Sequence, residues 1–186
     1  MTSEEEFDYI YYTYALTLYD NVPLVEPLEY SDRQRIRDFV IVIDTSASVD
    51  GDLVQAFLNK TWNLLKSSET FSHTVNIHIL QCDADVQSDT CLTSRDEFDA
   101  FLNGLSLKGF GGTDFRPAFT YIDGLLEKGE FTDLTGVIYF TDGDGVYPDA
   151  EPEYKTAFVF IEDNYTDRNV PVWAIKQILE KEDLKA

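Results

Sequence analysis

The chain has 186 residues, the length of a single domain, and 44% of them are hydrophobic, so it can bury a core and is not expected to be disordered. Asp and Glu total 35 against 14 Lys and Arg, and a formal charge of −21 repels phosphate backbones and anionic lipid surfaces. We therefore expect no nucleic-acid partner and no membrane partner. With no secretory signal and no apolar run of about 18 residues, we expect a cytoplasmic protein.

The first predicted element is a β-hairpin in the N-terminal part of the chain. Aromatic and β-branched residues alternate over 9–18, Asp20-Asn21 indicates a turn, and a second strand can return over 22–28. We therefore predict two parts: an N-terminal hairpin extension over residues 1–37, packed on the body, and a main domain over residues 38–186.

Strands and helices are predicted to alternate along the main domain. The run Phe39-Val40-Ile41-Val42-Ile43 is continuously apolar, which is typical of a central parallel strand covered on both faces. This pattern predicts a doubly wound α/β sheet with mostly parallel strands. The later elements are a helix over 53–66, a strand over 73–81, a short helix behind a capping box of Ser94 and Glu97, a helix over 115–128, strands over 136–141 and 156–161, and a strand or strand-helix piece over 170–179.

Three loops are predicted to meet at the carboxyl edge of this sheet, where such folds bind ligands. They carry a set of oxygen donors, with Asp44, Ser46 and Ser48 in alternation after the first buried strand. The candidate metal ligands are Asp44, Ser46, Ser48, Thr113 and Asp142. None of them offers sulfur or imidazole, so the set favours Mg²⁺, Mn²⁺ or Ca²⁺ over zinc or copper.

Other residues near these loops carry weaker predictions. Arg116 is expected to pair with a nearby carboxylate, because a helix start rich in acids favours an arginine partner. Cys82 ends an apolar run and is predicted to be a buried small hydrophobe. Four further acids are candidates for the same edge: Asp83, Asp85, Asp114 and Asp144.

The donor set resembles the metal-ion-dependent adhesion site (MIDAS) of von Willebrand factor A (VWA) domains. Its parts are Asp44-x-Ser46-x-Ser48, then Thr113, then Thr141-Asp142-Gly143. The stretches 111–117 and 139–143 are similar, more narrowly, to a bacterial VWA-like family that carries a metallopeptidase label.

That resemblance implies a Rossmann-like VWA fold and a role for each ligand. Ser46, Ser48 and Thr113 would touch the ion, and Asp44 and Asp142 would act mostly through water. It also implies a protein partner that offers an acidic residue. An AAA-type ATPase is one class of partner, since some VWA relatives work beside such enzymes.

Two classes of function follow from the residues, and a third from the family label. The first is a binding module in which the metal bridges this domain to a carboxylate of a partner protein. The alternative is a Mg-dependent α/β phosphohydrolase with Asp44 as nucleophile, although Ser46 stands where a second acid is expected. Peptidase activity would need an upstream region, because His-Glu-x-x-His does not occur. We therefore expect a binding module and not an enzyme.

Overall fold

The computed structural model describes residues 36–46, 51–67, 71–109, 111–162 and 165–180. All of them belong to the unit that spans residues 35–186. The predicted N-terminal hairpin lies outside the described residues, as does Ser48, so the predicted division at residue 37 stays a prediction. Within the described ranges, no helix has the length and apolar character needed to cross a membrane.

A six-stranded sheet forms the centre of the described body, with the strand order β3-β2-β1-β4-β5-β6. β2 and β3 are antiparallel, and every other neighbouring pair is parallel, which confirms the predicted mostly parallel α/β sheet. The strands are β1 (Ile36–Asp44), β2 (Phe71–Cys82), β3 (Val86–Leu92), β4 (Leu134–Phe140), β5 (Thr156–Ile161) and β6 (Ile175–Leu179).

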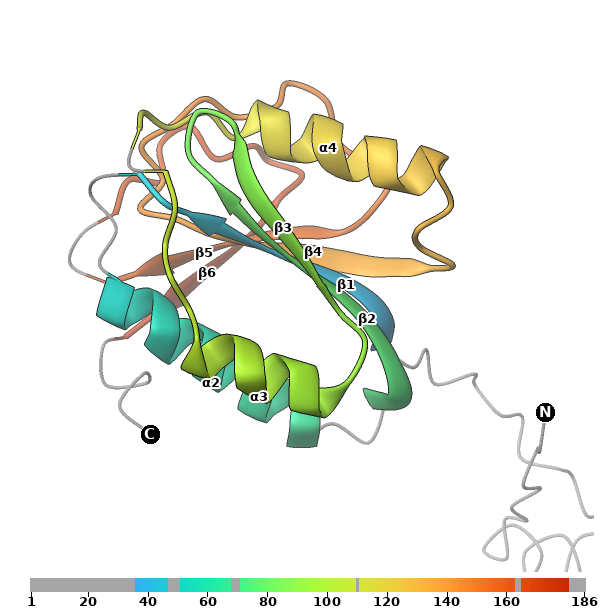
Figure 1. Ribbon diagram of the computed structural model, residues 1–186. Helices are drawn as coiled ribbons and strands as arrows, with labels where there is room; N and C mark the ends of the chain where they lie inside the picture. The colour runs from blue at the N-terminus through green and yellow to red at the C-terminus, as the bar shows by residue number, and fades with distance from the viewer. Residues whose placement is uncertain (1–35, 47–50, 68–70, 110, 163–164, 181–186) are drawn as a thin grey trace, which may run out of the picture. The chain divides into compact units, whose positions relative to one another are not determined.

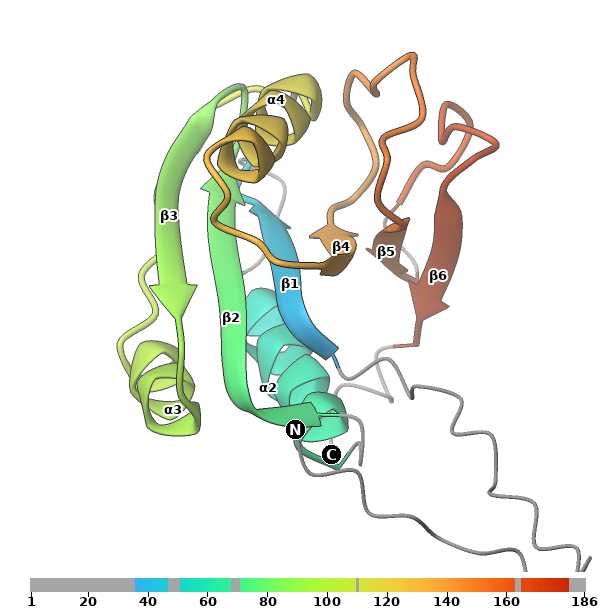
Figure 2. The same ribbon diagram turned by 90° about the vertical axis from the view of Figure 1, so that its right-hand side faces the viewer.

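Helices cover both faces of the sheet, as a doubly wound fold requires (Figure 1). One face carries α2 and α3, and the opposite face carries α4, which Figure 2 shows from the side. The helices are α2 (Gly51–Ser67), α3 (Arg95–Asn103) and α4 (Arg116–Glu127). The three predicted helices are therefore confirmed.

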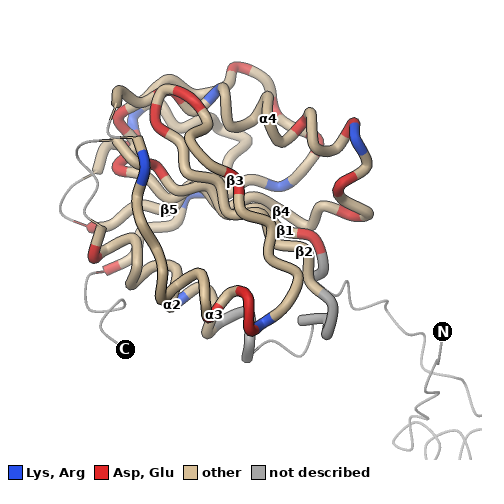
Figure 3. The backbone as a smooth tube through the Cα atoms, in the orientation of Figure 1, with Lys and Arg blue, Asp and Glu red and all other residues tan. Residues whose placement is uncertain are grey.

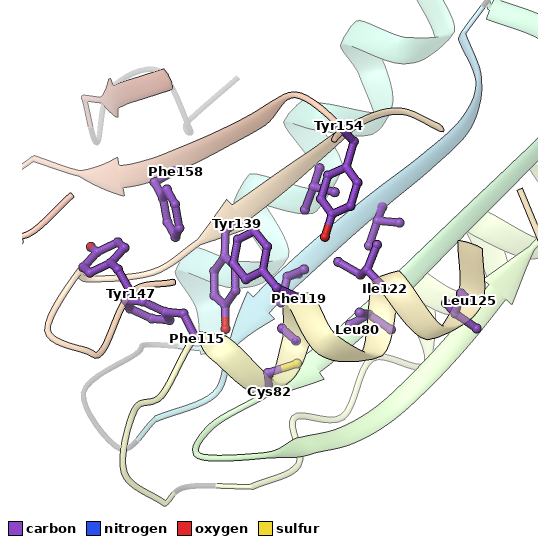
Figure 4. Packing of buried hydrophobic residues seen from close by; sticks show 14 of the residues in the cluster. Leu80, Cys82, Phe115, Phe119, Ile122, Leu125, Tyr139, Tyr147, Tyr154 and Phe158 are labelled. Atoms are coloured by element: carbon purple, nitrogen blue, oxygen red, sulfur yellow. The ribbon is translucent and has the colours of Figure 1, made fainter. Parts of the chain in front are cut away.

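β1 is buried on both faces because its side chains enter two separate cores. Phe39, Ile41 and Ile43 pack with residues of α2 and α3. Val40 and Val42 pack on the other side with residues of α4. Figure 4 shows part of this second core, in which the ring of Phe119 in α4 packs on the rings of Tyr139 in β4 and Phe158 in β5. The continuous apolar run in the sequence thus forms a central strand covered on both faces, as predicted.

Two parts of the sheet differ from the prediction. No strand is predicted over Val86–Leu92, where β3 lies at the edge of the sheet. Four of its seven residues, Gln87 to Thr90, are polar, so it lacks the apolar alternation that marks a strand in sequence. Only Ile175–Leu179 of the predicted element over 170–179 forms a strand, and the residues before it form turns.

Two local predictions can be compared with the structure directly. Ser94 caps α3 as predicted, since its Oγ accepts a hydrogen bond from Glu97 N–H at 3.3 Å. The Glu97 carboxylate also accepts from the N–H and hydroxyl of Thr93, at 2.7 and 3.0 Å. Cys82 is buried as predicted, and both it and the exposed Cys91 are free thiols.

Gly124 lies within α4, where glycine lowers the stability of a helix. A Cβ built at this position meets no atom within 4 Å. We therefore expect Gly124→Ala to raise the free energy of unfolding by up to about 1 kcal/mol, because alanine favours the helix and its methyl group has room. Urea unfolding of the two proteins measures this difference, and a loss of stability would contradict the expectation.

Candidate metal centre

β1 and β4 are neighbours in the middle of the sheet, and the strands that follow them in the chain, β2 and β5, lie toward opposite edges of the sheet. From β1 the chain passes through α2 to β2 on one side, whereas β4 lies on the other side of β1. Ligands of doubly wound sheets bind beyond the carboxyl ends of strands at such a switch point. Asp44 is the last residue of β1, and Thr141 directly follows β4. In Figure 1 the loop leading into α4 lies at the end of the sheet toward which β1 points.

Asp44 is fully buried, and both of its carboxylate oxygens accept hydrogen bonds. Oδ1 accepts from Ser46 N–H at 2.8 Å, and Oδ2 accepts from the Thr141 hydroxyl at 2.5 Å. Burial raises the pKa of Asp44 above its ordinary value; hydrogen bonds from Thr141 and Ser46 oppose this rise, and the charge of Asp142 adds to it. A cation beside this carboxylate would favour its charged form.

Thr141 links the first and third predicted loops. Its Oγ1 donates to Asp44 and accepts a hydrogen bond from Gly143 N–H at 3.0 Å. Asp142 is half-buried, and its carboxylate accepts from Asp144 N–H at 3.1 Å. The backbone carbonyl of Asp142 accepts from Thr166 N–H at 2.8 Å. Thr141 belongs to the sequence motif, but its hydroxyl bridge to Asp44 is visible only in the structure.

Thr113 lies against the same third loop. A Cβ added to Gly145 would come within 2.8 Å of Thr113 Cγ2, so the Thr113 methyl group lies close against the Gly145 backbone. The next residue, Asp114, forms an isolated parallel bridge with Val146, and Phe115 N–H donates to the Val146 carbonyl at 3.0 Å. These backbone contacts hold the second predicted loop beside the third.

Asp83 organises the glycine-rich loop, a role that was not predicted for it. It is buried at the end of β2, and its carboxylate accepts from Gly111 N–H at 3.0 Å and from the Gln87 amide at 2.9 Å. A Cβ on Gly109 would lie 2.7 Å from Thr45 Oγ1 and 2.8 Å from Asp83 Oδ2, and the φ of Gly109 is +118°. Glycine is therefore needed here, where the second loop passes the first. The signal in the sequence is an acid directly after a buried strand.

The remaining acids at this edge play different parts. Asp114 pairs with Arg116, whose Nη2 lies 2.6 Å from the carboxylate, which confirms the predicted partner of Arg116. This pairing lowers the pKa of Asp114. Asp85 caps its own turn by accepting from Val86 N–H at 2.8 Å. Figure 3 shows that acidic segments outnumber basic ones on this side of the body.

The described loops thus bring four of the five predicted ligands to one edge of the sheet. They are Asp44, Ser46, Thr113 and Asp142, whereas Ser48 lies outside the described residues. In the part of the chain that the structure describes, no group of three or more His, Cys, Asp or Glu side chains could hold a metal ion. A cation at this edge would therefore depend on hydroxyl and water oxygens beside the two carboxylates. Such a donor set fits a hard divalent ion.

The fold and this edge place the protein in the VWA-like class of α/β domains, with six mostly parallel strands between helices. The sequence matches the VWA-like domain family (DUF2201) over residues 39–180, and the chain belongs to this family. No curated protein matches the sequence.

The solved structures to which this chain is similar include a mussel protein and a bacterial one. Proximal thread matrix protein 1 from the mussel byssus is 13% identical with a TM-score of 0.57, over 82% of this chain and 44% of that chain. The chain therefore spans less than half the length of that protein. A second structure of it, with a zinc-occupied MIDAS motif, has a TM-score of 0.54 over 70% of this chain and 39% of that one. An aerotolerance-related membrane protein from Bacteroides fragilis is 14% identical with a TM-score of 0.49, over 79% and 93%.

Proposed function

We propose that this domain binds one divalent cation at the carboxyl edge of its sheet and uses that ion to bind an acidic group of a partner protein. Ser46, Ser48 and Thr113 would supply hydroxyl ligands, and Asp44 and Asp142 would act through water. The observation that supports this most is the buried Asp44 carboxylate, held by Ser46 and Thr141 beside a second acid.

The kind of ligand explains why such an ion would bind a carboxylate from outside. Neutral hydroxyls donate little charge to a cation, so an ion held mainly by them stays strongly electrophilic. Mg²⁺ and related ions also keep positions for water or an external oxygen ligand. Thr113 and Asp142 are both partly exposed, so an outside group can approach this edge. The partner would therefore complete the coordination of the ion.

The burial of Asp44 favours a binding module over the alternative of a phosphohydrolase. A nucleophilic carboxylate must present an oxygen to the substrate phosphorus. Asp44 has no exposed surface, and each of its oxygens already accepts a hydrogen bond. Asp44 is therefore suited to orienting the two loops and to balancing the charge of a bound ion.

The choice of ion and of partner belongs to the same proposal. The oxygen-only donor set favours Mg²⁺, Mn²⁺ or Ca²⁺. The mussel protein of similar fold holds zinc in its MIDAS motif, so zinc should be included in any comparison of ions. For the partner, we propose a protein that presents an exposed acid, with an AAA-type ATPase as one class to test.

Replacing Thr113 with Val tests the proposed ligand set. Valine keeps the methyl group that lies against Gly145 and removes the hydroxyl. We expect the metal-free variant to melt close to wild type, but Mg²⁺ or Mn²⁺ to raise its melting temperature far less. Scanning calorimetry with Mg²⁺, Mn²⁺, Ca²⁺ and Zn²⁺ in turn measures the shift for each ion.

The matched control is Thr120→Val on the exposed side of α4. It makes the same chemical change away from the predicted ligands and should keep the full metal response. A wild-type protein with no response to any of the four ions would overturn the proposed function. A full response in Thr113→Val would remove Thr113 from the ligand set.

A further inference from the structure

The large apolar side chains that are exposed in the described residues all lie in the C-terminal third of the chain. They are Val146, Tyr165, Val172, Ile175 and Ile178. Val172 is fully exposed, and Val146 is 49% exposed. Single exposed apolar residues are common on protein surfaces, but several near one another often mark a binding surface.

Val146 and Val172 both line one pocket of about 520 Å³. One wall comes from residues 145–149, in the loop after β4, and the other from residues 169 and 171–173, in the loop before β6. Pro148, Pro171 and Trp173 add further apolar surface to the lining, and Asp149 and Asn169 give it polar surface as well. Pockets of about 300–1,000 Å³ hold small ligands, so this one has room for a large side chain with its backbone. We call it the valine pocket.

Two aromatic residues that line the valine pocket are held in place by packing against the second core. Trp173 packs edge-on against Phe119 of α4, with ring centroids 6.3 Å apart. Tyr147 packs edge-on against Phe115 at 4.6 Å, and its hydroxyl donates to the carbonyl of Gly143 at 3.2 Å. Because both rings are held by the second core, a ligand would not have to order these two walls itself. Such preorganisation favours binding.

The valine pocket directly adjoins the proposed metal centre. Gly145 lines the pocket and also lies against Thr113. Asp142 is held through its carbonyl by Thr166, in the loop that supplies the second wall. A partner whose carboxylate reached an ion between Thr113 and Asp142 would therefore have its adjacent residues over this pocket.

From this juxtaposition we infer the chemistry of the partner site: an acidic residue with a large aliphatic side chain next to it. The inference rests on the proposed function, because the carboxylate would bind the ion while the aliphatic side chain enters the valine pocket. Pairing the two contacts would give selectivity, since an acid with polar neighbours would leave apolar pocket surface exposed. The partner segment would carry little further negative charge, because the chain bears −21 and acids such as Asp144 and Asp149 flank the edge.

Three short peptides with blocked ends test this inference. The first has Asp at its centre with Leu on both sides, the second has Asp with Ser on both sides, and the third has Asn with Leu on both sides. Binding is measured in the presence of the ion that stabilises the protein most, by calorimetry and by tryptophan fluorescence. Trp173 should report binding, whereas Trp62 is buried against Phe98 on the opposite face of the sheet.

We expect the Leu-flanked Asp peptide to bind at least about tenfold more tightly than the Ser-flanked one, because burial of one leucine side chain is sufficient for that ratio. Val172→Ser should remove most of this preference and leave the response of the melting temperature to metal unchanged. Ile178→Ser, an exposed aliphatic residue on β6 outside the pocket, should keep the preference.

The outcomes separate this inference from the proposed function. Equal binding of the two Asp peptides, or no binding of the Leu-flanked one by a protein that responds to metal, would overturn the valine pocket and leave the metal centre in place. Equal binding of the Asn and Asp peptides would show that no carboxylate contacts the ion, and would count against both. A preference for Leu that survives Val172→Ser and Val146→Ser would also overturn the role of the pocket.

Discussion

Asp44→Asn is expected to abolish the stabilisation of this protein by divalent cations. At a metal concentration of about 100 times its dissociation constant, binding stabilises a wild-type fold by about 2.7 kcal/mol, which for a domain of this size is a rise of roughly 5–10 °C in melting temperature. Asparagine keeps the shape of Asp44 and its contact with Ser46 N–H but removes the charge that would balance the ion. Calorimetry with and without metal gives the result.

The same variant should change how the stability of the metal-free protein depends on pH. The pKa of Asp44 is raised in the folded state, so the unfolded chain ionises this carboxyl first and folding loses stability as pH rises through the raised pKa. Asparagine carries no such penalty. The free energy of unfolding of Asp44→Asn, relative to wild type, should therefore increase between pH 4 and pH 7.

The matched control for Asp44→Asn is Asp144→Asn. Asp144 is an exposed acid near the same edge, and its replacement makes the same change of charge. It should keep the metal response. If Asp44→Asn kept the full metal response, Asp44 would not belong to the centre.

Gly143→Ala is expected to give the largest loss of stability of any single methyl addition in the described residues. The φ of Gly143 is +85°, and a Cβ there would lie 2.0 Å from the carbonyl oxygen of Thr166 and 2.9 Å from the ring of Phe160. The loop must move to make room, which breaks the turn that orients Asp142. We expect a loss of about 3 kcal/mol or more, measured by urea unfolding, together with a loss of metal binding.

Gly129→Ala separates the steric effect from backbone strain. Its φ is +75°, close to that of Gly143, but an added Cβ meets no atom within 4 Å. We expect a loss of only about 1 kcal/mol there and an unchanged response to metal. Similar losses at the two positions would mean that the contact with Thr166 is not the main constraint on Gly143.

Local sequence patterns were sufficient to predict the central elements. Phe39–Ile43 is apolar at every position, and only a strand between two helical layers requires that, so β1 was predictable without knowledge of its neighbours. The position of the oxygen donors could also be predicted from local patterns. Asp44 and Asp142 each follow an apolar run, and in a parallel sheet such positions share one edge.

The contacts that complete the site could not be predicted in this way, because they join residues far apart in the chain. Asp83 supports the glycine-rich loop through Gly111, 28 residues away, and the Thr141 hydroxyl reaches Asp44 across 97 residues. Most of β3 is polar because it lies at an edge, so its strand pairing with β2 left little trace in its composition. The valine pocket likewise depends on two loops meeting. Burial within one element is encoded by its own residue pattern, whereas the approach of separate loops is decided by the packing of the whole sheet.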